Sequence, residues 1–279
     1  MQKSPMDNPQ KVTMFGREHE VKGEIYFQSL KDANIAFGTS VGITSKPNED
    51  CLGVSVLGSE TVLAIADGHW GRAASEIAIS KAVELLHPDI SPSKDSETRA
   101  RLFALFEQIN VTLFDMAMTV PGAPASETTL VVCYVKETER SKYLYWSSFG
   151  DSFLFIFRTG ELKQINSLSS YWLGFLSKLS ENALSKSISI KFLSDEARYV
   201  GVASGLESGI EKLESGDLLF LCTDGLIGSD REPDESVLNG IIEILISDSS
   251  LESKVEKVIG SALARGEEDN ISCVMAQIT

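Results

Sequence analysis

The feature of the sequence that most constrains its fold is an apolar run that ends abruptly at an acidic residue. Residues 62–66 are all apolar and predict a buried strand. Asp67, Gly68 and His69 follow directly, and a helical pattern begins at residue 73. A carboxylate at the end of a buried strand is unfavourable unless a cation neutralises it. The run therefore indicates a metal site, with an ordinary Asp-Gly turn as the alternative.

The two residues after Asp67 suit the same interpretation. Gly68 has no side chain, so the backbone can approach an ion closely and its carbonyl is a candidate oxygen ligand. His69 would then lie beside the ion, where a proton donor is useful. The alternative for His69 is an ordinary histidine of a surface loop.

Acidic residues also border other predicted strands. They are Glu49, Asp50, Asp151, Asp224 and Asp269. Because strand ends can converge at one edge of a sheet, these carboxylates are candidates for a shared site. Hard oxygen ligands suit Mg²⁺ or Mn²⁺ rather than zinc. Two such ions bridged by one carboxylate can activate a water and orient a phosphoryl group.

The amino-acid composition and net charge are those of a globular protein and argue against some classes of partner. Hydrophobic residues make up 43% and charged residues 23% of the 279 residues, as in an ordinary globular protein. The net charge of −15 argues against nucleic acid or an anionic membrane as a partner. No apolar run is long enough to span a bilayer, and residues 1–10 lack the apolar core of a signal peptide. The four cysteines have no metal-ligand spacing, so we expect buried thiols in a cytoplasmic protein.

The pattern of elements predicts an α+β fold. The strands are expected at about residues 35–43, 51–57, 61–67, 130–135, 142–149, 152–158, 161–165, 218–222 and 271–278, and the helices at 73–86, 97–118, 233–246 and 251–263. The strands come in blocks separated by helices, without strict alternation. This pattern favours antiparallel sheets with helices packed outside them.

Two segments fit this pattern less well. Residues 1–33 are predicted to be an N-terminal tail with one added strand near residues 24–29, and residues 34–279 a single domain. Residues 166–207 contain an aromatic cluster (Tyr171, Trp172 and Phe175), a short helical pattern at 176–184 and a strand-like run at 188–193. An insertion of this length is either a functional lid or a structural excursion.

The order of the short motifs resembles that of the PPM family, the metal-dependent, type 2C protein serine/threonine phosphatases. The motifs are Asn48-Glu49-Asp50, Asp67-Gly68-His69, Thr128-Thr129, Gly150-Asp151-Ser152, the segment 213–226 and Asp269-Asn270-Ile271-Ser272. The resemblance covers about residues 35–278. It implies two packed antiparallel sheets flanked by pairs of helices, with residues 166–207 as the family's flap.

The resemblance also implies a role for each acidic residue. Asp67 would bridge two Mg²⁺ or Mn²⁺ ions, and the Gly68 carbonyl would bind one of them. Asp224 and Asp269 would hold one ion, and Asp151 matches the position of a third, weaker one.

Two further roles follow from the same resemblance. Glu49 and Asp50 would serve the metal site directly or through water. His69 would be the general acid for the leaving alkoxide.

The sequence departs from the family's pattern at three places. The family's phosphate-gripping Arg is replaced by Ser45, so we expect Lys46 to help hold the phosphate as a point charge. The family's Gly-Thr-Thr begins here with Glu127. Bacterial members often have Asp-Gly-Met-Gly-Gly, whereas this chain has Trp70 after His69.

The leading hypothesis is a monomeric Mg²⁺- or Mn²⁺-dependent phosphatase that acts on phosphoserine and phosphothreonine in protein substrates. The loss of the Arg at Ser45 and the presence of Glu127 leave a second hypothesis open, a weak or inactive relative that serves as a regulatory or binding module. A hydrolase of small phosphate esters is a third.

Overall fold

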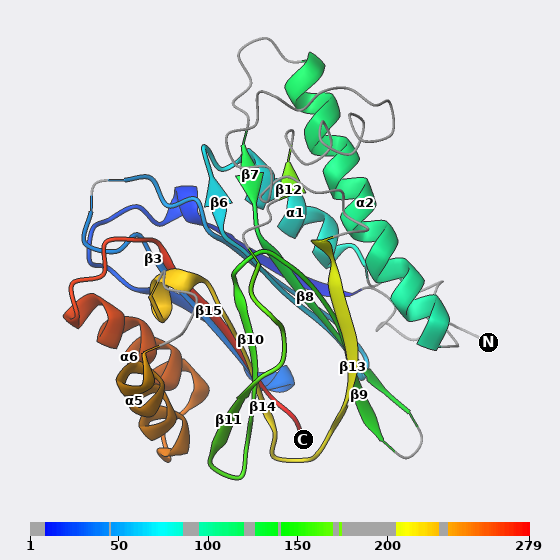
Figure 1. Ribbon diagram of the computed structural model, residues 1–279. Coiled ribbons are helices and arrows are strands. Elements are labelled where there is room, and N and C mark those ends of the chain that lie inside the picture. The colour runs from blue at the N-terminus through cyan, green and yellow to red at the C-terminus, as the bar shows by residue number, and fades with distance from the viewer. Residues whose placement is uncertain are drawn as a thin grey trace.

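The computed structural model describes residues 9–44, 46–85, 95–119, 126–138, 141–169, 173–174, 205–228 and 234–279. Its two main sheets are antiparallel and lie face to face (Figure 1). The first contains, in spatial order, β1 (Gln10–Phe15), β4 (Cys51–Leu57), β5 (Glu60–Ala66), β8 (Leu130–Glu137), β9 (Lys142–Phe149) and β13 (Glu207–Leu213). The second contains β11 (Glu161–Gln164), β10 (Phe153–Arg158), β14 (Leu218–Cys222), β15 (Ile271–Gln277), β3 (Ile35–Ser40) and β2 (Tyr26–Leu30).

A pair of helices covers the outer face of each sheet (Figure 1). The helices α1 (Ala73–Val83) and α2 (Asp95–Thr119) pack on the first sheet. The helices α5 (Glu235–Ile246) and α6 (Leu251–Ala264) pack on the second. The predicted α+β sandwich of two antiparallel sheets flanked by helix pairs is therefore confirmed.

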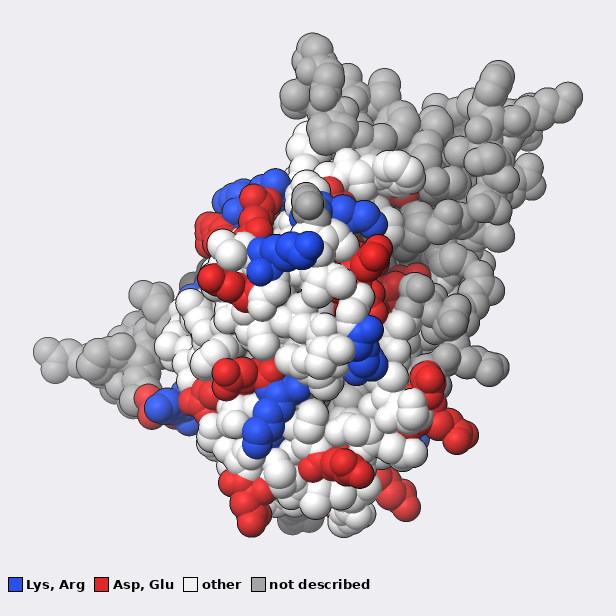
Figure 2. All heavy atoms as spheres, turned by 90° about the vertical axis from the view of Figure 1, so that its left-hand side faces the viewer, with Lys and Arg blue, Asp and Glu red and all other residues white. Residues whose placement is uncertain are grey.

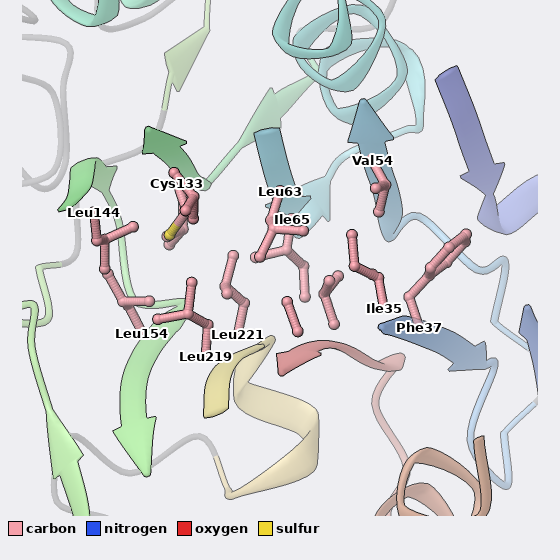
Figure 3. Packing of buried hydrophobic residues seen from close by; sticks show 14 of the residues in the cluster. Ile35, Phe37, Val54, Leu63, Ile65, Cys133, Leu144, Leu154, Leu219 and Leu221 are labelled. Carbon is pink, nitrogen blue, oxygen red and sulfur yellow. The ribbon is translucent and has the colours of Figure 1, made fainter. Parts of the chain in front are cut away.

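The central strands carry long apolar runs because both faces of each sheet are covered. In β5, Val62 and Ala64 face the helices while Leu63 and Ile65 face the other sheet. Figure 3 shows Leu63 and Ile65 meeting Leu219 and Leu221 of β14 between the sheets. The continuous apolar runs in the sequence are thus a consequence of burial on two sides.

The helices follow local sequence rules. Asp234 caps α5 by accepting a hydrogen bond from the Ser236 N–H, and Ser250 caps α6 by accepting one from Ser253. One side of α2, which includes Leu102, Phe106 and Ile109, is apolar and is buried against the first sheet. All four cysteines are buried free thiols, as expected. No helix in the described part of the chain is long and apolar enough to cross a membrane.

The N-terminal region is more ordered than the sequence predicts. The strand expected near residues 24–29 is β2, which pairs with β3. The tail prediction omits β1, which pairs with β4 along its whole length. It also omits the short 3₁₀ turns Gly16–Glu18 and Lys31–Ala33. Residues 9–33 therefore supply an edge strand to each sheet.

Other elements were also missed. β13 falls at the end of the predicted insertion, and a small ribbon forms from β6 (Gly68–His69), β7 (Glu127–Thr128) and β12 (Leu173–Gly174). The predicted strand 35–43 ends earlier, at Ser40. The aromatic cluster Tyr171, Trp172 and Phe175, the helical pattern 176–184 and the strand 188–193 lie outside the described residues.

Candidate active site

Acidic residues from both sheets meet at one edge of the sandwich. Asp50 directly precedes β4 and Asp67 directly follows β5, and these strand ends pair through Cys51 and Ala66. In the second sheet, Asp224 opens the 3₁₀ turn η4 (Asp224–Leu226) just after β14, and Asp269 lies just before β15. The paired ends of β14 and β15 therefore carry the second pair of carboxylates.

The fifth aspartate comes from the connection between the sheets. Asp151 lies between β9 of the first sheet and β10 of the second. Phe153, the first residue of β10, pairs with Cys222 at the end of β14. This pairing brings Asp151 to the edge that carries Asp224.

Electrostatics show that these carboxylates form one group. Burial raises the pKa of Asp67 well above its usual value, and the charges of Asp50, Asp224, Asp269 and Asp151 raise it further, in that order. Mutual repulsion among buried carboxylates opposes their ionisation. The five aspartates that border the predicted strands therefore lie within electrostatic reach of one another.

Two of the carboxylates have a buried oxygen that suits a cation. Burial raises the pKa of Asp50 and that of Asp224 to about 7. Thr223 donates a hydrogen bond of 3.0 Å to Asp50 Oδ2. Asp50 Oδ1 and Asp224 Oδ1 are buried without a hydrogen-bond partner within the described residues. Unpaired buried carboxylate oxygens are costly, and a bound divalent cation would remove that cost.

The carboxylates do not form a closed cage. Within the described residues, no three acidic, His or Cys side chains converge tightly enough to surround one ion. Mg²⁺ usually keeps several waters and takes only one or two carboxylates from the protein. The donor chemistry therefore fits Mg²⁺ or Mn²⁺ held partly by water, and does not fit an ion enclosed by side chains.

Close backbone contacts explain the glycine after Asp67. A Cβ on Gly68 would lie 2.5 Å from the Glu49 carbonyl oxygen and 2.9 Å from Ser75 Oγ. Ser75 Oγ donates to that same carbonyl at 2.5 Å. Only glycine allows this approach, which places Glu49 and Asp50 beside Asp67.

A second close contact joins the loops of the other sheet. A Cβ on Gly225 would lie 2.1 Å from the Asn270 carbonyl oxygen, so η4 rests directly on the segment that carries Asp269. Asn270 Oδ1 also accepts a 2.8 Å hydrogen bond from the Glu49 N–H. Asn270 thus links the loops of the two sheets.

The Thr128-Thr129 motif holds Asp67 by its backbone. Thr128 Oγ1 donates to the Asp67 carbonyl at 2.8 Å, and Thr129 Oγ1 accepts from the Asp67 N–H at 3.0 Å. Ser152 shares a 2.7 Å hydrogen bond with Thr129. Neither hydroxyl has a role that its sequence neighbours indicate, and the Thr128-Thr129 pair stands out only by its place in the order of motifs.

His69 lies at the edge of the acidic group. Its side chain is 36% exposed, and Nδ1 is 3.7 Å from Asp67 Oδ1. In the small ribbon, His69 pairs with Glu127 of β7, whose carboxylate is almost fully buried. Residues directly opposite each other in an antiparallel pair project on the same side. The Glu that replaces the family's Gly therefore adds another acid beside His69.

The predicted phosphate-binding residues are only partly described. Ser45 lies outside the described residues. Lys46 is exposed, and its N–H donates to Thr44 Oγ1 at 3.0 Å. Burial raises the pKa of Glu49, while a hydrogen bond from the Gly71 backbone and the charges of Arg72 and Lys46 oppose that rise. Lys46 and Arg72 therefore lie within electrostatic reach of the acidic group.

The sandwich of two antiparallel sheets, with aspartates at one edge, has the fold of the PPM phosphatases. No family model matches the sequence. It is 25% identical over 241 residues to the serine/threonine protein phosphatase PstP of Mycobacterium tuberculosis, covering 85% of this chain and 43% of PstP. It is 25% identical over 256 residues to the serine/threonine phosphatase stp of Listeria monocytogenes, covering 86% of this chain and 94% of that protein.

Solved structures agree on the fold. Stp1 of Staphylococcus aureus superposes with a TM-score of 0.66 and 20% identity, covering 95% of this chain and all of Stp1 (100%). The catalytic domain of PstP with two manganese ions superposes with a TM-score of 0.60 and 22% identity, covering 92% and 100% of the two chains. The expected resemblance to the PPM family is thus confirmed. It spans less than half the length of PstP (43%).

Proposed function

We propose that the protein is a metal-dependent phosphatase that hydrolyses phosphoserine and phosphothreonine in protein substrates. The observation that carries the proposal is the group of five aspartates from both sheets, with buried oxygens on Asp50 and Asp224 that lack a partner within the described residues. Relatives named as serine/threonine phosphatases favour the enzyme over an inactive binding module.

The cofactor in this proposal is Mg²⁺ or Mn²⁺, bound as two ions. When bound, the ions would neutralise the phosphate charge and supply an activated water. Asp67 would bridge them, with the Gly68 carbonyl, Asp224 and Asp269 completing the protein's share of the ligands. Asp151 would serve a third, weaker ion.

The remaining residues act on the substrate and on the ligands. Glu49 and Asp50 support the site directly or through water. His69 donates a proton to the leaving serine or threonine oxygen, and its exposed edge leaves it accessible to a bound peptide. Lys46 contributes positive charge near the phosphate, with Ser45 in the position of the family's Arg. A monomeric state and a cytoplasmic location remain predictions.

Replacing Asp224 with Asn tests the metal site. The variant should bind Mn²⁺ at least about tenfold more weakly, because it loses a charged oxygen ligand, and it should lose most of its activity toward a phosphothreonine peptide. Isothermal titration with Mn²⁺ gives a readout independent of turnover. Asp248→Asn, on the exposed connection between α5 and α6, is the matched control.

The proposal also predicts that the activity of the unmodified protein depends on a metal ion. Phosphate release from a phosphothreonine peptide should require Mg²⁺ or Mn²⁺ and stop with EDTA. Unchanged Mn²⁺ binding in Asp224→Asn would refute the ligand assignment. Absence of any turnover with metal present would favour the inactive alternative.

A further inference from the structure

A pocket of about 330 Å³ beside the acidic group is lined by an unusual concentration of cations. Its walls are formed by Glu20, Lys22, Thr44, Lys46, Pro47 and Arg72. The whole chain carries 40 acidic residues against 25 lysines and arginines. The pocket therefore has an excess of positive charge, whereas the whole chain has an excess of negative charge.

The pocket adjoins the candidate active site through the backbone. Lys46 and Pro47 directly precede the Asn48-Glu49-Asp50 motif, and Arg72 directly follows the Asp67–Gly71 loop. The charges of Arg72 and Lys46 both act on Glu49. A peptide whose phosphoresidue lies at the aspartates would thus extend over the pocket within a few residues, since an extended chain spans about 3.3 Å per residue.

The cations of the pocket are available to a ligand. Arg72 Nη2 lies 2.7 Å from Glu20 Oε1, and the side chains are 34% and 42% exposed. Lys22 and Lys46 form no salt bridge within the described residues. In Figure 2, which faces the left side of Figure 1, Lys and Arg atoms gather in the upper half with Asp and Glu beside them. The ion pair with Glu20 shows that Arg72 can bind an oxyanion at this exposed surface.

We propose that this pocket binds a second anionic side chain of the peptide substrate, a phosphoryl or carboxylate group close in sequence to the phosphoresidue that is hydrolysed. The inference rests on the proposed phosphatase function. Guanidinium and ammonium groups bind both kinds of oxyanion, and the dianionic phosphoryl group gains more from the charges of Arg72 and Lys22. When no such group is bound, Arg72 forms its ion pair with Glu20 instead.

Binding of non-hydrolysable peptides tests the pocket without any need for turnover. Each peptide carries the phosphonate analogue of phosphothreonine, with Gln, Glu or the phosphonate analogue of phosphoserine at flanking positions. Fluorescence anisotropy in the presence of Mn²⁺ should show about threefold to fivefold tighter binding for Glu than for Gln, and tighter binding still for the second phosphonate. The two arms separate a carboxylate ligand from a phosphoryl ligand.

Three variants assign the effect to the pocket. Arg72→Gln should abolish most of the preference for the anionic flank. Glu20→Gln should increase the preference, because it removes the competing carboxylate. Lys163→Gln, on the exposed edge strand β11, makes the same change in net charge as Arg72→Gln and should leave the preference unchanged.

Two results would overturn the inference. One is equal binding of the Gln, Glu and phosphonate peptides by the unmodified protein. The other is an anionic preference that Arg72→Gln and Lys163→Gln reduce equally, which would indicate long-range attraction alone. Turnover of a parent phosphothreonine peptide is measured separately, so failure of the phosphatase proposal is distinguishable from failure of the pocket.

Discussion

Three buried carboxylates form the centre of the candidate site. Asp50, Asp67 and Asp224 are the side chains that the fold buries together, and burial raises the pKa of each. Their positions were predictable because each lies within two residues of a strongly apolar strand. The burial of Glu127 was not predictable, since it depends on pairing with His69, which lies 58 positions earlier in the sequence.

The proposed role of His69 as the general acid can be tested by a single substitution. His69→Ala should slow hydrolysis of a phosphothreonine peptide by about a hundredfold or more, because an alkoxide is a poor leaving group and needs a proton. Hydrolysis of p-nitrophenyl phosphate should fall much less, because p-nitrophenolate leaves without protonation. Steady-state kinetics on both substrates, at saturating Mn²⁺, provide the comparison. Equal losses on the two substrates would show that His69 is not the general acid.

At the scale of elements, long apolar runs were predictable and weakly patterned strands were not. The central strands are buried on both faces, and their sequences show it. β1 and β13 lie at the edges of the first sheet, and each has only one fully buried residue, Met14 and Leu213. The ribbon of β6, β7 and β12 has only two residues per strand, so its sequence carries no periodic signal at all.

The contact between η4 and the segment before β15 can be tested by replacing Gly225, which lies in the contact, and Gly240, which lies outside it. Gly225→Ala should destabilise the protein by about 1–3 kcal/mol, because its new methyl group meets the Asn270 carbonyl. It should also weaken Mn²⁺ binding by moving Asp224 away from Asp269. Gly240→Ala in α5, with no atom within 4 Å of the new group, should instead stabilise by about 0.5–1 kcal/mol.

Chemical denaturation and Mn²⁺ titration of both variants would decide the matter. If Gly225→Ala were as stable as Gly240→Ala and bound Mn²⁺ normally, the two loops would not need close contact to build the site.

When no metal is bound, the acidic group makes the stability of the whole molecule depend on pH. Asp50 and Asp224 have pKa values of about 7 in the folded protein and near 3.8 in the unfolded chain. The folded state therefore holds extra protons between these values, and its stability decreases as pH rises through that window. In EDTA, the free energy of unfolding should fall by on the order of 5 kcal/mol between pH 5 and pH 8, about half of it from each carboxylate, or about 10–20 °C in Tm.

Scanning calorimetry with and without Mn²⁺ checks this expectation. A bound cation stabilises the ionised carboxylates, so Mn²⁺ should remove most of the decrease between pH 5 and pH 8. A Tm that is independent of pH in EDTA would show that the carboxylates do not repel one another in the folded protein.

The position of β15 has a consequence for the order in which this chain can fold. β15 follows every other described strand in the sequence, yet it lies in the middle of the second sheet, between β14 and β3. During synthesis, the edge of β3 that does not face β2 would stay unpaired until the segment after α6 had left the ribosome. Such late, long-range pairing is slow and leaves strand edges exposed to aggregation. Because Asp269 lies two residues before β15, the insertion of that one strand closes the sheet and brings Asp269 to the other aspartates in the same step.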